Sequence, residues 1–246
     1  MSRRHSYRTV LITGATSDIG REIALRFARE GWDIVCHYFS SEEKANRLKQ
    51  ALKKYNISCH LLKADFLSRA QLMNFIERIK KIDIDTLVNN AGTYTASRHF
   101  SKLTISDIEN TFMVNVFAPM LIAINIFDRM KEKYFGRIVS ISSISAKYGG
   151  SCNSMHYASS KLALEGLTKN LAREGARYNI LVNTIRPGVI KTSFHKKFPK
   201  DMKKRIAMIP LKKMGVPEDI ADMAYHLGGD KNNFITNEII TISGGE

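Results

Sequence analysis

The chain has 246 residues, 44% of them apolar, which is enough to bury the core of one domain without requiring a second. Its formal net charge of +15 is high, but no zinc-ligand spacing, recognition-helix pattern or aromatic-interleaved basic repeat accompanies the charge, so we expect no nucleic-acid partner. The apolar runs are strand-length or periodic, unlike a membrane span, so we expect a cytoplasmic protein with no membrane segment. Cys36, Cys59 and Cys152 are isolated, which predicts neither a disulfide framework nor a metal site.

Short apolar, β-branched segments alternate with helical patterns along the chain. We predict strands at 9–13, 33–37, 57–62, 85–89, 137–141, 180–185 and 238–242. The intervening segments carry apolar residues at helical spacing, for example Leu72, Phe75, Ile76 and Ile79. Strands that alternate with helices under right-handed crossovers form an α/β fold with a doubly wound parallel sheet.

The first predicted strand leads into a glycine turn and an amphipathic helix that runs through residue 29. The turn contains Gly14, Thr16, Ser17, Asp18, Ile19 and Gly20. Backbone amides at such a helix start point outward with the positive end of the helix dipole, so a pyrophosphate can dock there if no Cβ intervenes. The simpler alternative is a tight turn with a capped helix, but the strand-turn-helix context favours a nucleotide site.

A second motif, Tyr157 followed by Lys161, falls in a predicted helix after the serine-rich strand end at 140–143. Residues four apart share one face of a helix, so the ammonium would lie beside the phenol. An adjacent ammonium favours the phenolate and is expected to lower the pKa of the tyrosine, which makes it a usable acid or base. A Tyr-x-x-x-Lys pair alone is more often solvated helix surface, so this interpretation depends on the accompanying motifs.

Taken in order, these motifs resemble the short-chain dehydrogenase/reductases, most closely their 3-oxoacyl-[acyl carrier protein] reductase branch. The resemblance covers nearly the whole chain. Thr13, Gly14 and Gly20 match the family's Thr-Gly-x-x-x-Gly-x-Gly turn, with Asp18 at the middle glycine. The resemblance implies further cofactor contacts from Asp65, Phe66, Asn90, Ala91, Gly92, Pro187, Gly188, Val189, Ile190 and Thr192, as well as from Tyr157 and Lys161.

The same resemblance implies a catalytic tetrad of Asn115, Ser143, Tyr157 and Lys161. Tyr157 would donate a proton to a ketone and Ser143 would hydrogen-bond its oxygen. Lys161 would grip the nicotinamide ribose, and Asn115 would hold a water that links Lys161 to solvent. The resemblance further implies a single Rossmann-type domain with strand order 3-2-1-4-5-6-7, a mobile substrate lid at 188–216, and a homotetramer with helices starting near Thr104 and Met155 between subunits.

Three of these residues have competitors in the sequence. Asn115 lies in an apolar helical segment and can equally be a satisfied buried amide. Ser142 adjoins Ser143, and successive strand side chains alternate, so only one of them faces the site; position in the family pattern favours Ser143. His156 is a titratable neighbour of Tyr157, but adjacent helical residues point roughly 100° apart, which argues against it as the acid.

The end of the second strand usually decides which nicotinamide cofactor binds, because an acidic residue there accepts hydrogen bonds from the ribose and repels a 2′-phosphate. Here Tyr38 occupies the position where the family often has aspartate, and Ser40 and Ser41 follow it. We therefore expect NADP(H) to be preferred, with NAD(H) possible. Asp18 is expected to repel a pyrophosphate unless it faces a ribose hydroxyl or solvent. If that repulsion matters, replacing Asp18 with glycine should strengthen cofactor binding.

The predicted lid is strongly basic. Lysines and arginines between residues 191 and 213 face one acid, Asp201; they are Lys191, Lys196, Lys197, Lys200, Lys203, Lys204, Arg205, Lys212 and Lys213. Such a lid suits an acyl carrier protein or a phosphate-bearing substrate such as a coenzyme A thioester, although a solvated charged face is an equally good interpretation. The expected reaction is reduction of a 3-oxoacyl thioester, as in fatty acid biosynthesis. The alternatives are a sugar, a steroid or another secondary alcohol as substrate and, less favoured, a non-catalytic dinucleotide-binding sensor.

Overall fold

A parallel seven-stranded sheet forms the centre of the protein. The computed structural model describes residues 8–94, 98–194 and 201–246. The strands are β1 (Thr9–Ile12), β2 (Asp33–Tyr38), β3 (Cys59–Lys63), β4 (Thr86–Asn89), β5 (Gly136–Ile141), β6 (Ile180–Pro187) and β7 (Ile239–Ile242). Their order in the sheet is β3-β2-β1-β4-β5-β6-β7, and every neighbouring pair is parallel. The predicted fold class and strand order are confirmed.

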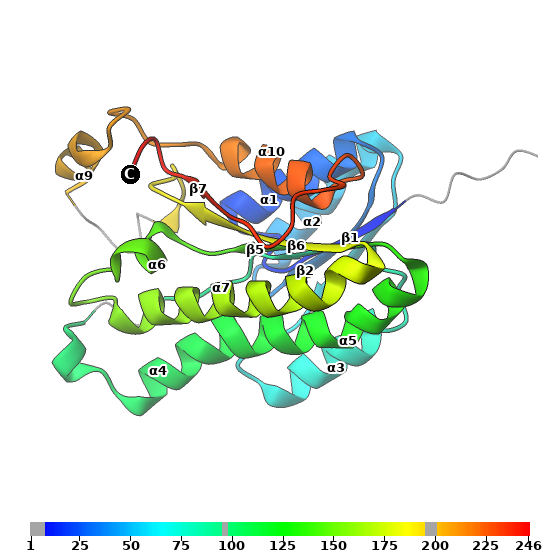
Figure 1. Ribbon diagram of the computed structural model, residues 1–246, viewed down its shortest axis with the longest axis horizontal. Coiled ribbons are helices and arrows are strands. Elements are labelled where there is room, and N and C mark those ends of the chain that lie inside the picture. Colours follow the sequence, from blue (N-terminus) through cyan, green and yellow to red (C-terminus); the bar gives the residue numbers. More distant parts are fainter. Residues whose placement is uncertain (1–7, 95–97, 195–200) are drawn as a thin grey trace, which may run out of the picture.

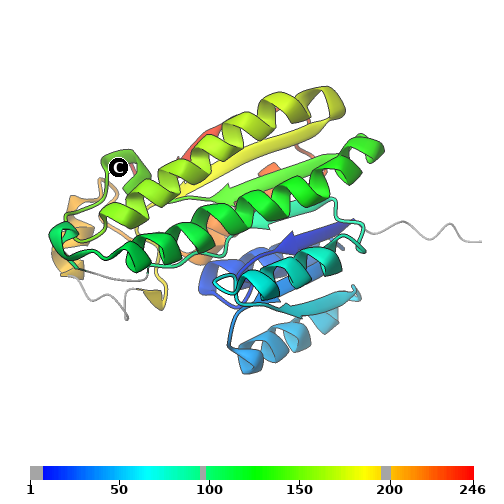
Figure 2. The same cartoon turned by 90° about the horizontal axis from the view of Figure 1, so that it is seen from below.

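Helices cover both faces of this sheet, as the two views of the ribbon show (Figures 1 and 2). One layer contains α1 (Asp18–Arg29), α2 (Glu42–Leu52) and α10 (Pro217–Gly228), and the other contains α3 (Arg69–Ile79), α4 (Ile105–Phe112), α5 (Ala118–Lys133) and α7 (Met155–Gly175). Shorter helices are α6 (Ile144–Tyr148), α9 (Met202–Met208), η1 (Lys53–Tyr55), η2 (Phe100–Lys102), η3 (Met113–Phe117) and η4 (Ala176–Tyr178).

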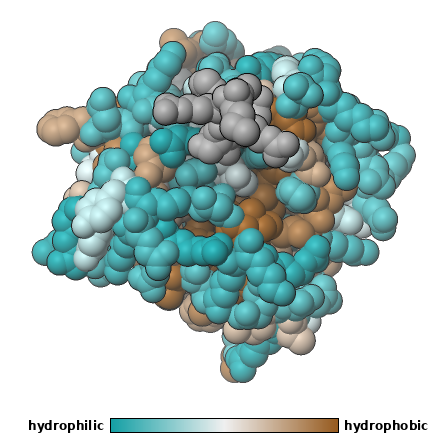
Figure 3. All heavy atoms as spheres, turned by 90° about the vertical axis from the view of Figure 1, so that its right-hand side faces the viewer, coloured by the Kyte–Doolittle hydropathy of each residue, from teal (hydrophilic) through white to brown (hydrophobic). Residues whose placement is uncertain are grey.

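The strands are buried because each supplies side chains to both layers. Val10 and Ile12 of β1 pack in the core under α1 and α10, whereas Leu11 between them packs in the core under α3 and α5. This alternation follows from the two-residue repeat of a strand. It also explains why the strands read as continuous apolar runs in the sequence. The face at the amino ends of the strands is mostly hydrophilic and includes a smaller hydrophobic patch (Figure 3).

The run from α4 through η3 to α5 is unusually apolar. Among the described residues, Ile105–Lys133 is the one helical stretch long and apolar enough to cross a membrane by length and composition, but half of its most apolar window is buried inside the protein. The buried side belongs to the core against β4 and β5. On the other side, the helices leave large apolar side chains exposed, namely Ile105, Phe117, Leu121 and Ile124, joined by Leu162 of α7; we call these five residues the outer apolar face.

One buried histidine fixes the glycine turn to the sheet. The Gly14 amide donates to Nδ1 of His37 over 3.1 Å, and Nε2 of His37 lies 3.1 Å from the Ala64 carbonyl oxygen, so the neutral ring accepts at one nitrogen and donates at the other. Its ring stacks on Phe66 with centroids 4.0 Å apart. Burial lowers the pKa of His37 to about 4. The fold therefore requires the uncharged imidazole.

We expect this histidine to make the protein less stable in acid. Because its folded pKa of about 4 lies below the ordinary value of 6.5, its contribution is complete above pH 6.5 and is lost as the pH falls from 6.5 toward 4. The shift corresponds to at most about 3 kcal/mol. Urea unfolding across this pH range will show a shallower pH dependence for His37→Gln, whose neutral amide keeps a donor and an acceptor, than for the wild type. Equal slopes would contradict this assignment.

Candidate active site

The glycine turn packs directly against the end of β4. Gly14 has φ +64°, and a Cβ there would lie 2.9 Å from Cα of Ala91. A Cβ on Gly20 would lie 2.4 Å from the Gly14 carbonyl oxygen and 2.7 Å from Nδ2 of Asn90. Asn90 donates from that nitrogen to the carbonyl oxygens of Thr13 and Gly14, at 2.9 and 3.0 Å. These glycines are therefore required by the packing of the turn, in addition to any clearance for a ligand.

Helix α1 starts from this turn with a side-chain cap. The Ser17 hydroxyl accepts from the Gly20 amide at 3.1 Å and donates to the Gly14 carbonyl oxygen at 2.9 Å. Thr16 and Ile19 flank the cap and are partly exposed. The start of α1 lies at the carboxyl edge of the sheet, where the amides of a first helical turn favour an anion. The turn predicted to bind a pyrophosphate thus has the geometry that such binding needs.

The residues expected at the adenosine end are divided between surface and core. Ser40 is exposed, Ser41 is partly exposed, and Asp65 is a partly exposed residue whose Oδ1 accepts from the Leu67 amide at 2.9 Å. Tyr38 is 7% exposed, and burial together with Glu42 raises its pKa. Phe66 is 4% exposed under His37, so its ring is part of the core and only its backbone is available at the surface.

The predicted proton donor and its serine partner meet at the carboxyl end of β5. Tyr157, in the first turn of α7, lies close enough to Ser143 for this serine to lower the pKa of its phenol. Ser143 also caps α6 by accepting from the Ser145 amide at 3.1 Å. The Ser142 hydroxyl turns the other way and donates to Oε1 of Glu165 at 2.7 Å. Ser143 is therefore the serine that faces Tyr157. His156 is 2% exposed and stacks on Tyr94.

Lys161 is buried with its ammonium on the backbone. Its Nζ donates to the Ile141 carbonyl oxygen at 2.8 Å and lies 5.9 Å from the centre of the Tyr157 ring. Burial lowers the pKa of Lys161 to about 8, and the Glu165 carboxylate opposes that change. The pKa of Tyr157 is raised, because the effect of burial outweighs the opposing effect of Ser143. The predicted lowering of the Tyr157 pKa by Lys161 is thus wrong for this structure, where the ammonium bonds to Ile141.

A buried carboxylate that was not expected from the sequence lies next to this lysine. Glu165 is 1% exposed and lies one helical turn beyond Lys161 on the same face of α7. It accepts from Nε and Nη2 of Arg186 at 2.6 and 2.5 Å, a bidentate pair. Arg186 immediately precedes Pro187, so this pair ties the helix of Tyr157 to the end of β6. The signal in the sequence was the four-residue spacing from Tyr157 to Lys161 to Glu165.

Asn115 lies in η3, a π-helical turn between α4 and α5, and is fully buried. Its Nδ2 donates to the Thr93 carbonyl oxygen and the Ser160 hydroxyl at 3.0 and 2.9 Å, and its Oδ1 accepts from the Thr93 amide at 2.8 Å. A Cβ on Gly92 would lie 3.2 Å from Nζ of Lys161 and 3.5 Å from Oδ1 of Asn115. The four predicted tetrad residues and Gly92 thus gather at one edge of the sheet, and the side chain of Asn115 is also a satisfied buried amide.

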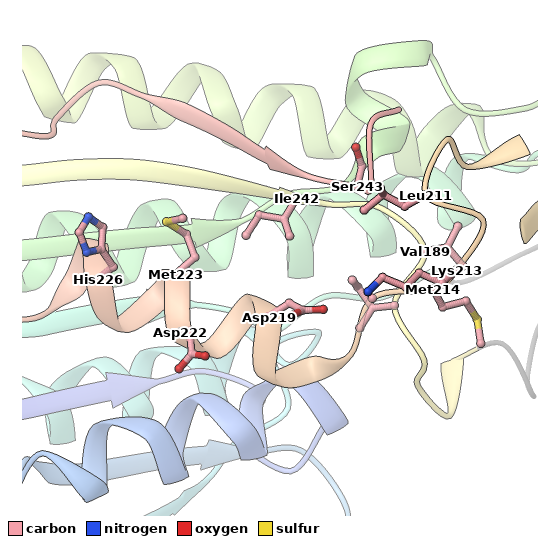
Figure 4. Close-up of a pocket in the computed structure, with 13 residues that line it drawn as sticks. Val189, Leu211, Lys213, Met214, Asp219, Asp222, Met223, His226, Ile242 and Ser243 are labelled. Carbon is pink, nitrogen blue, oxygen red and sulfur yellow. The ribbon is translucent and has the colours of Figure 1, made fainter.

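The segment after β6 turns back across the sheet edge. The Gly188 amide donates to the Ile242 carbonyl oxygen at 2.8 Å, and Ile190 forms a bridge with Gly215. Val189 and Ile190 are buried and line a cavity of about 560 Å³ between this segment, α10 and the end of β7 (Figure 4). Ile190 packs in the core under α10. Thr192 is partly exposed. The predicted lid residues 195–200, including Lys196, Lys197 and Lys200, lie outside the described residues.

Comparisons with known proteins agree with this geometry. The family model for short chain dehydrogenases matches residues 8–203. The 3-oxoacyl-[acyl-carrier-protein] reductase FabG of Aquifex aeolicus is 33% identical over 96% of this chain and 95% of its own. The L-rhamnose 1-dehydrogenase (NADP(+)) of Thermoplasma acidophilum is 33% identical over 97% of this chain and 95% of its own.

Solved structures resemble the chain over nearly its whole length. A blue fluorescent protein from a metagenomic library in complex with NADPH has a TM-score of 0.90 at 30% identity, with 97% of both chains covered. A 3-oxoacyl (acyl-carrier-protein) reductase from Agrobacterium tumefaciens with NADP bound has a TM-score of 0.89 at 26% identity, covering 97% of this chain and 94% of that one. With its fold, its glycine turn and the grouping of Ser143, Tyr157 and Lys161, the chain belongs to the short-chain dehydrogenase family of oxidoreductases.

Proposed function

We propose that the protein is an NADP(H)-dependent reductase that converts a ketone to a secondary alcohol, with a 3-oxoacyl thioester as substrate. The observation that carries the proposal is the grouping of Tyr157 and Ser143 beside the buried ammonium of Lys161, whose Nζ lies 5.9 Å from the centre of the Tyr157 ring. These groups lie at the edge of the sheet where the glycine turn ends.

The residues present fit a nicotinamide dinucleotide. The capped start of α1 suits a pyrophosphate. Because Gly92 has no side chain, its backbone lies close to Nζ of Lys161. When bound, the reduced cofactor supplies a hydride to the carbonyl carbon. The dinucleotide would be held by the turn at one end and by Tyr157 and Lys161 at the other.

The side chains supply the proton and stabilise the developing charge. Tyr157 has a raised pKa and is therefore protonated at neutral pH, which is the form that can donate to the carbonyl oxygen. Ser143 hydrogen-bonds that oxygen as negative charge develops on it. The Lys161 ammonium uses one of its three N–H groups on Ile141 and keeps others for the ribose. Asn115 bonds to Thr93 and Ser160 and holds them in place. After Tyr157 has donated its proton, a water beside Asn115 would link Lys161 to solvent, so that the tyrosine is protonated again.

The lid supports a carrier-bound acyl substrate over a free sugar. Its described part exposes Met208 and Leu211, at 65% and 63%, together with the exposed cations Lys203 and Lys204. Apolar side chains among cations suit an acyl chain presented by an acidic carrier protein or by coenzyme A. The similarity to a rhamnose dehydrogenase keeps a sugar as the second candidate substrate.

The substrate class can be tested by comparing turnover of several substrates. NADPH oxidation is measured with free ketones and with a 3-oxoacyl group carried on acyl carrier protein, on coenzyme A or on a simple thiol. NADP⁺ reduction is measured with L-rhamnose. We expect the carrier-bound thioester to have the highest kcat/KM, and high salt to reduce that advantage because it screens the basic lid. Tyr157→Phe should lower kcat by about 10²- to 10⁴-fold while NADPH still binds. No turnover with any substrate would favour the sensor alternative, and preference for rhamnose would favour the sugar alternative.

The preference for NADP(H) rests on the end of β2. Tyr38 occupies the position where an acidic residue would repel a 2′-phosphate. Ser40 and Ser41, which follow it, can hydrogen-bond that phosphate. Lys44, exposed in the first turn of α2, is close enough to influence the pKa of Asp18 in the glycine turn. Lys44 can therefore supply a positive charge to a 2′-phosphate. Both solved relatives described above hold NADPH or NADP.

Replacing this lysine tests the preference. Lys44→Ala should lower kcat/KM for NADPH by about tenfold, since a charge-assisted contact with a phosphate is lost, and should leave kcat/KM for NADH unchanged. Lys49→Ala, in the last turn of the same helix, is the matched control and should change neither value. Similar efficiencies of the wild type with NADPH and NADH would overturn the preference.

We further propose that a second copy of the chain covers the outer apolar face, as a step toward the tetramer expected from the family resemblance. Ile124 and Leu162 are 52% and 55% exposed on neighbouring helices, and exposed apolar patches of this kind are typical of protein interfaces. Sedimentation of Leu162→Glu should show a smaller assembly than the wild type. A wild-type monomer at micromolar concentration would disprove the proposal.

A further inference from the structure

Asp18, at the middle glycine position of the turn, makes a contact that its position in the sequence did not suggest. Its Oδ2 accepts a hydrogen bond from the Ser193 backbone amide at 2.6 Å, across 175 residues of chain. Burial raises the pKa of Asp18, but the Ser193 backbone and side-chain bonds and the charges of Lys44 and Arg21 outweigh it, so the pKa is lowered. The carboxylate is therefore ionised and directed at the segment that follows β6.

The segment that contains Ser193 is fixed on its other sides by different contacts. The Lys191 amide donates to the Gly215 carbonyl oxygen at 2.9 Å, and the Gly215 amide donates to the Val189 carbonyl oxygen at 3.0 Å. These bonds join the two ends of the lid to each other. Asp18 instead joins the lid to the glycine turn. The glycine turn and the start of the lid are thus connected directly by the protein's own contacts.

The connection continues toward the proton donor through aromatic rings. Phe194, next to Ser193, has its ring centre 6.3 Å from that of Tyr94, and the Tyr94 ring centre is 5.5 Å from that of Tyr157. The Tyr94 hydroxyl also donates to the Asn153 carbonyl oxygen at 2.5 Å, which fixes its ring. A displacement of Ser193 would therefore move one wall of the space in front of Tyr157.

We propose that Asp18 is a positioning residue that holds the start of the lid, through the Ser193 amide, in the place where Phe194 and Tyr94 border the substrate site. The proposal rests on the proposed function and deepens it, because it gives the cofactor turn a direct influence on substrate binding. It also accounts for a carboxylate in a turn built for a pyrophosphate. The charge is stabilised by donors from the lid, so its replacement by glycine loses the lid contact instead of simply relieving a repulsion.

Two substitutions separate the contact from the charge. Asp18→Ala removes the acceptor, and Asp18→Asn keeps an acceptor oxygen without the charge. The matched control is Asp33→Ala, because Oδ1 of Asp33 also accepts a backbone amide at 2.6 Å, from Ser58, at the opposite edge of the sheet. Three quantities are measured for each protein: hydrogen exchange of the peptide 189–194, the Kd of NADPH, and KM and kcat for the best thioester.

Asp18→Ala should speed exchange in the peptide 189–194 and raise the substrate KM by about fivefold to tenfold, with a smaller effect on kcat, since one charge-assisted hydrogen bond is lost at a partly exposed position. Asp18→Asn should recover most of both values, and Asp33→Ala should change neither. Unchanged exchange in Asp18→Ala, equal behaviour of the Ala and Asn variants, or the same KM change in Asp33→Ala would each overturn the proposal.

The exchange measurement keeps this inference separate from the proposed reaction. If the protein turns over no ketone but Asp18→Ala still loses protection at 189–194, the contact with the lid stands and the proposed function fails. If the thioester is reduced but protection and KM are unaffected in Asp18→Ala, the proposed function stands and Asp18 does not position the lid.

Discussion

The buried ammonium of Lys161 is the interaction on which the site depends. A charge in a dry interior is costly unless it is bonded and balanced, and here the Ile141 carbonyl oxygen accepts from it while Glu165 lies one turn away. Glu165 is in turn held by Arg186 and Ser142. Helix α7, the end of β5 and the end of β6 are thereby joined through a single set of polar contacts. The groups that we propose for the chemistry are held by the same bonds that stabilise the buried charges.

The parallel sheet explains why these groups meet. All seven strands run in one direction, so the glycine turn after β1, the segment after β4 and the serines after β5 emerge at one edge. His37 and Asn90 then tie the turn after β1 to its neighbours on both sides. Binding residues can therefore lie far apart in the sequence and still form one surface.

Much of this was accessible from the sequence because it depends on periodicity and local motifs. Apolar runs identified each strand, and the family resemblance implied the strand order that the sheet has. The alternation of strand side chains allowed only one of Ser142 and Ser143 to face the site, and the family pattern favoured Ser143, which lies toward Tyr157. The tertiary contacts were not accessible in this way. The sequence gives no sign that Lys161 bonds to Ile141, that Asp18 reaches Ser193, or that Cys36 and Cys59, although isolated in sequence, lie in contact on β2 and β3.

The π-helical turn η3 has a consequence for the length of the chain around it. A π turn contains one residue more than an α turn, so the residues that follow are rotated by about 100° relative to an uninterrupted α-helix. Asn115 sits inside this wider turn and reaches Thr93 and Ser160 from it. Losing one residue here would restore a regular helix, but it would rotate the buried side chains of α5 by about 100° relative to α4 and turn the Asn115 amide away from its partners. The extra residue therefore sets the register of α5 in the core together with the position of Asn115, and the spacing from α4 to α5 cannot vary independently of it.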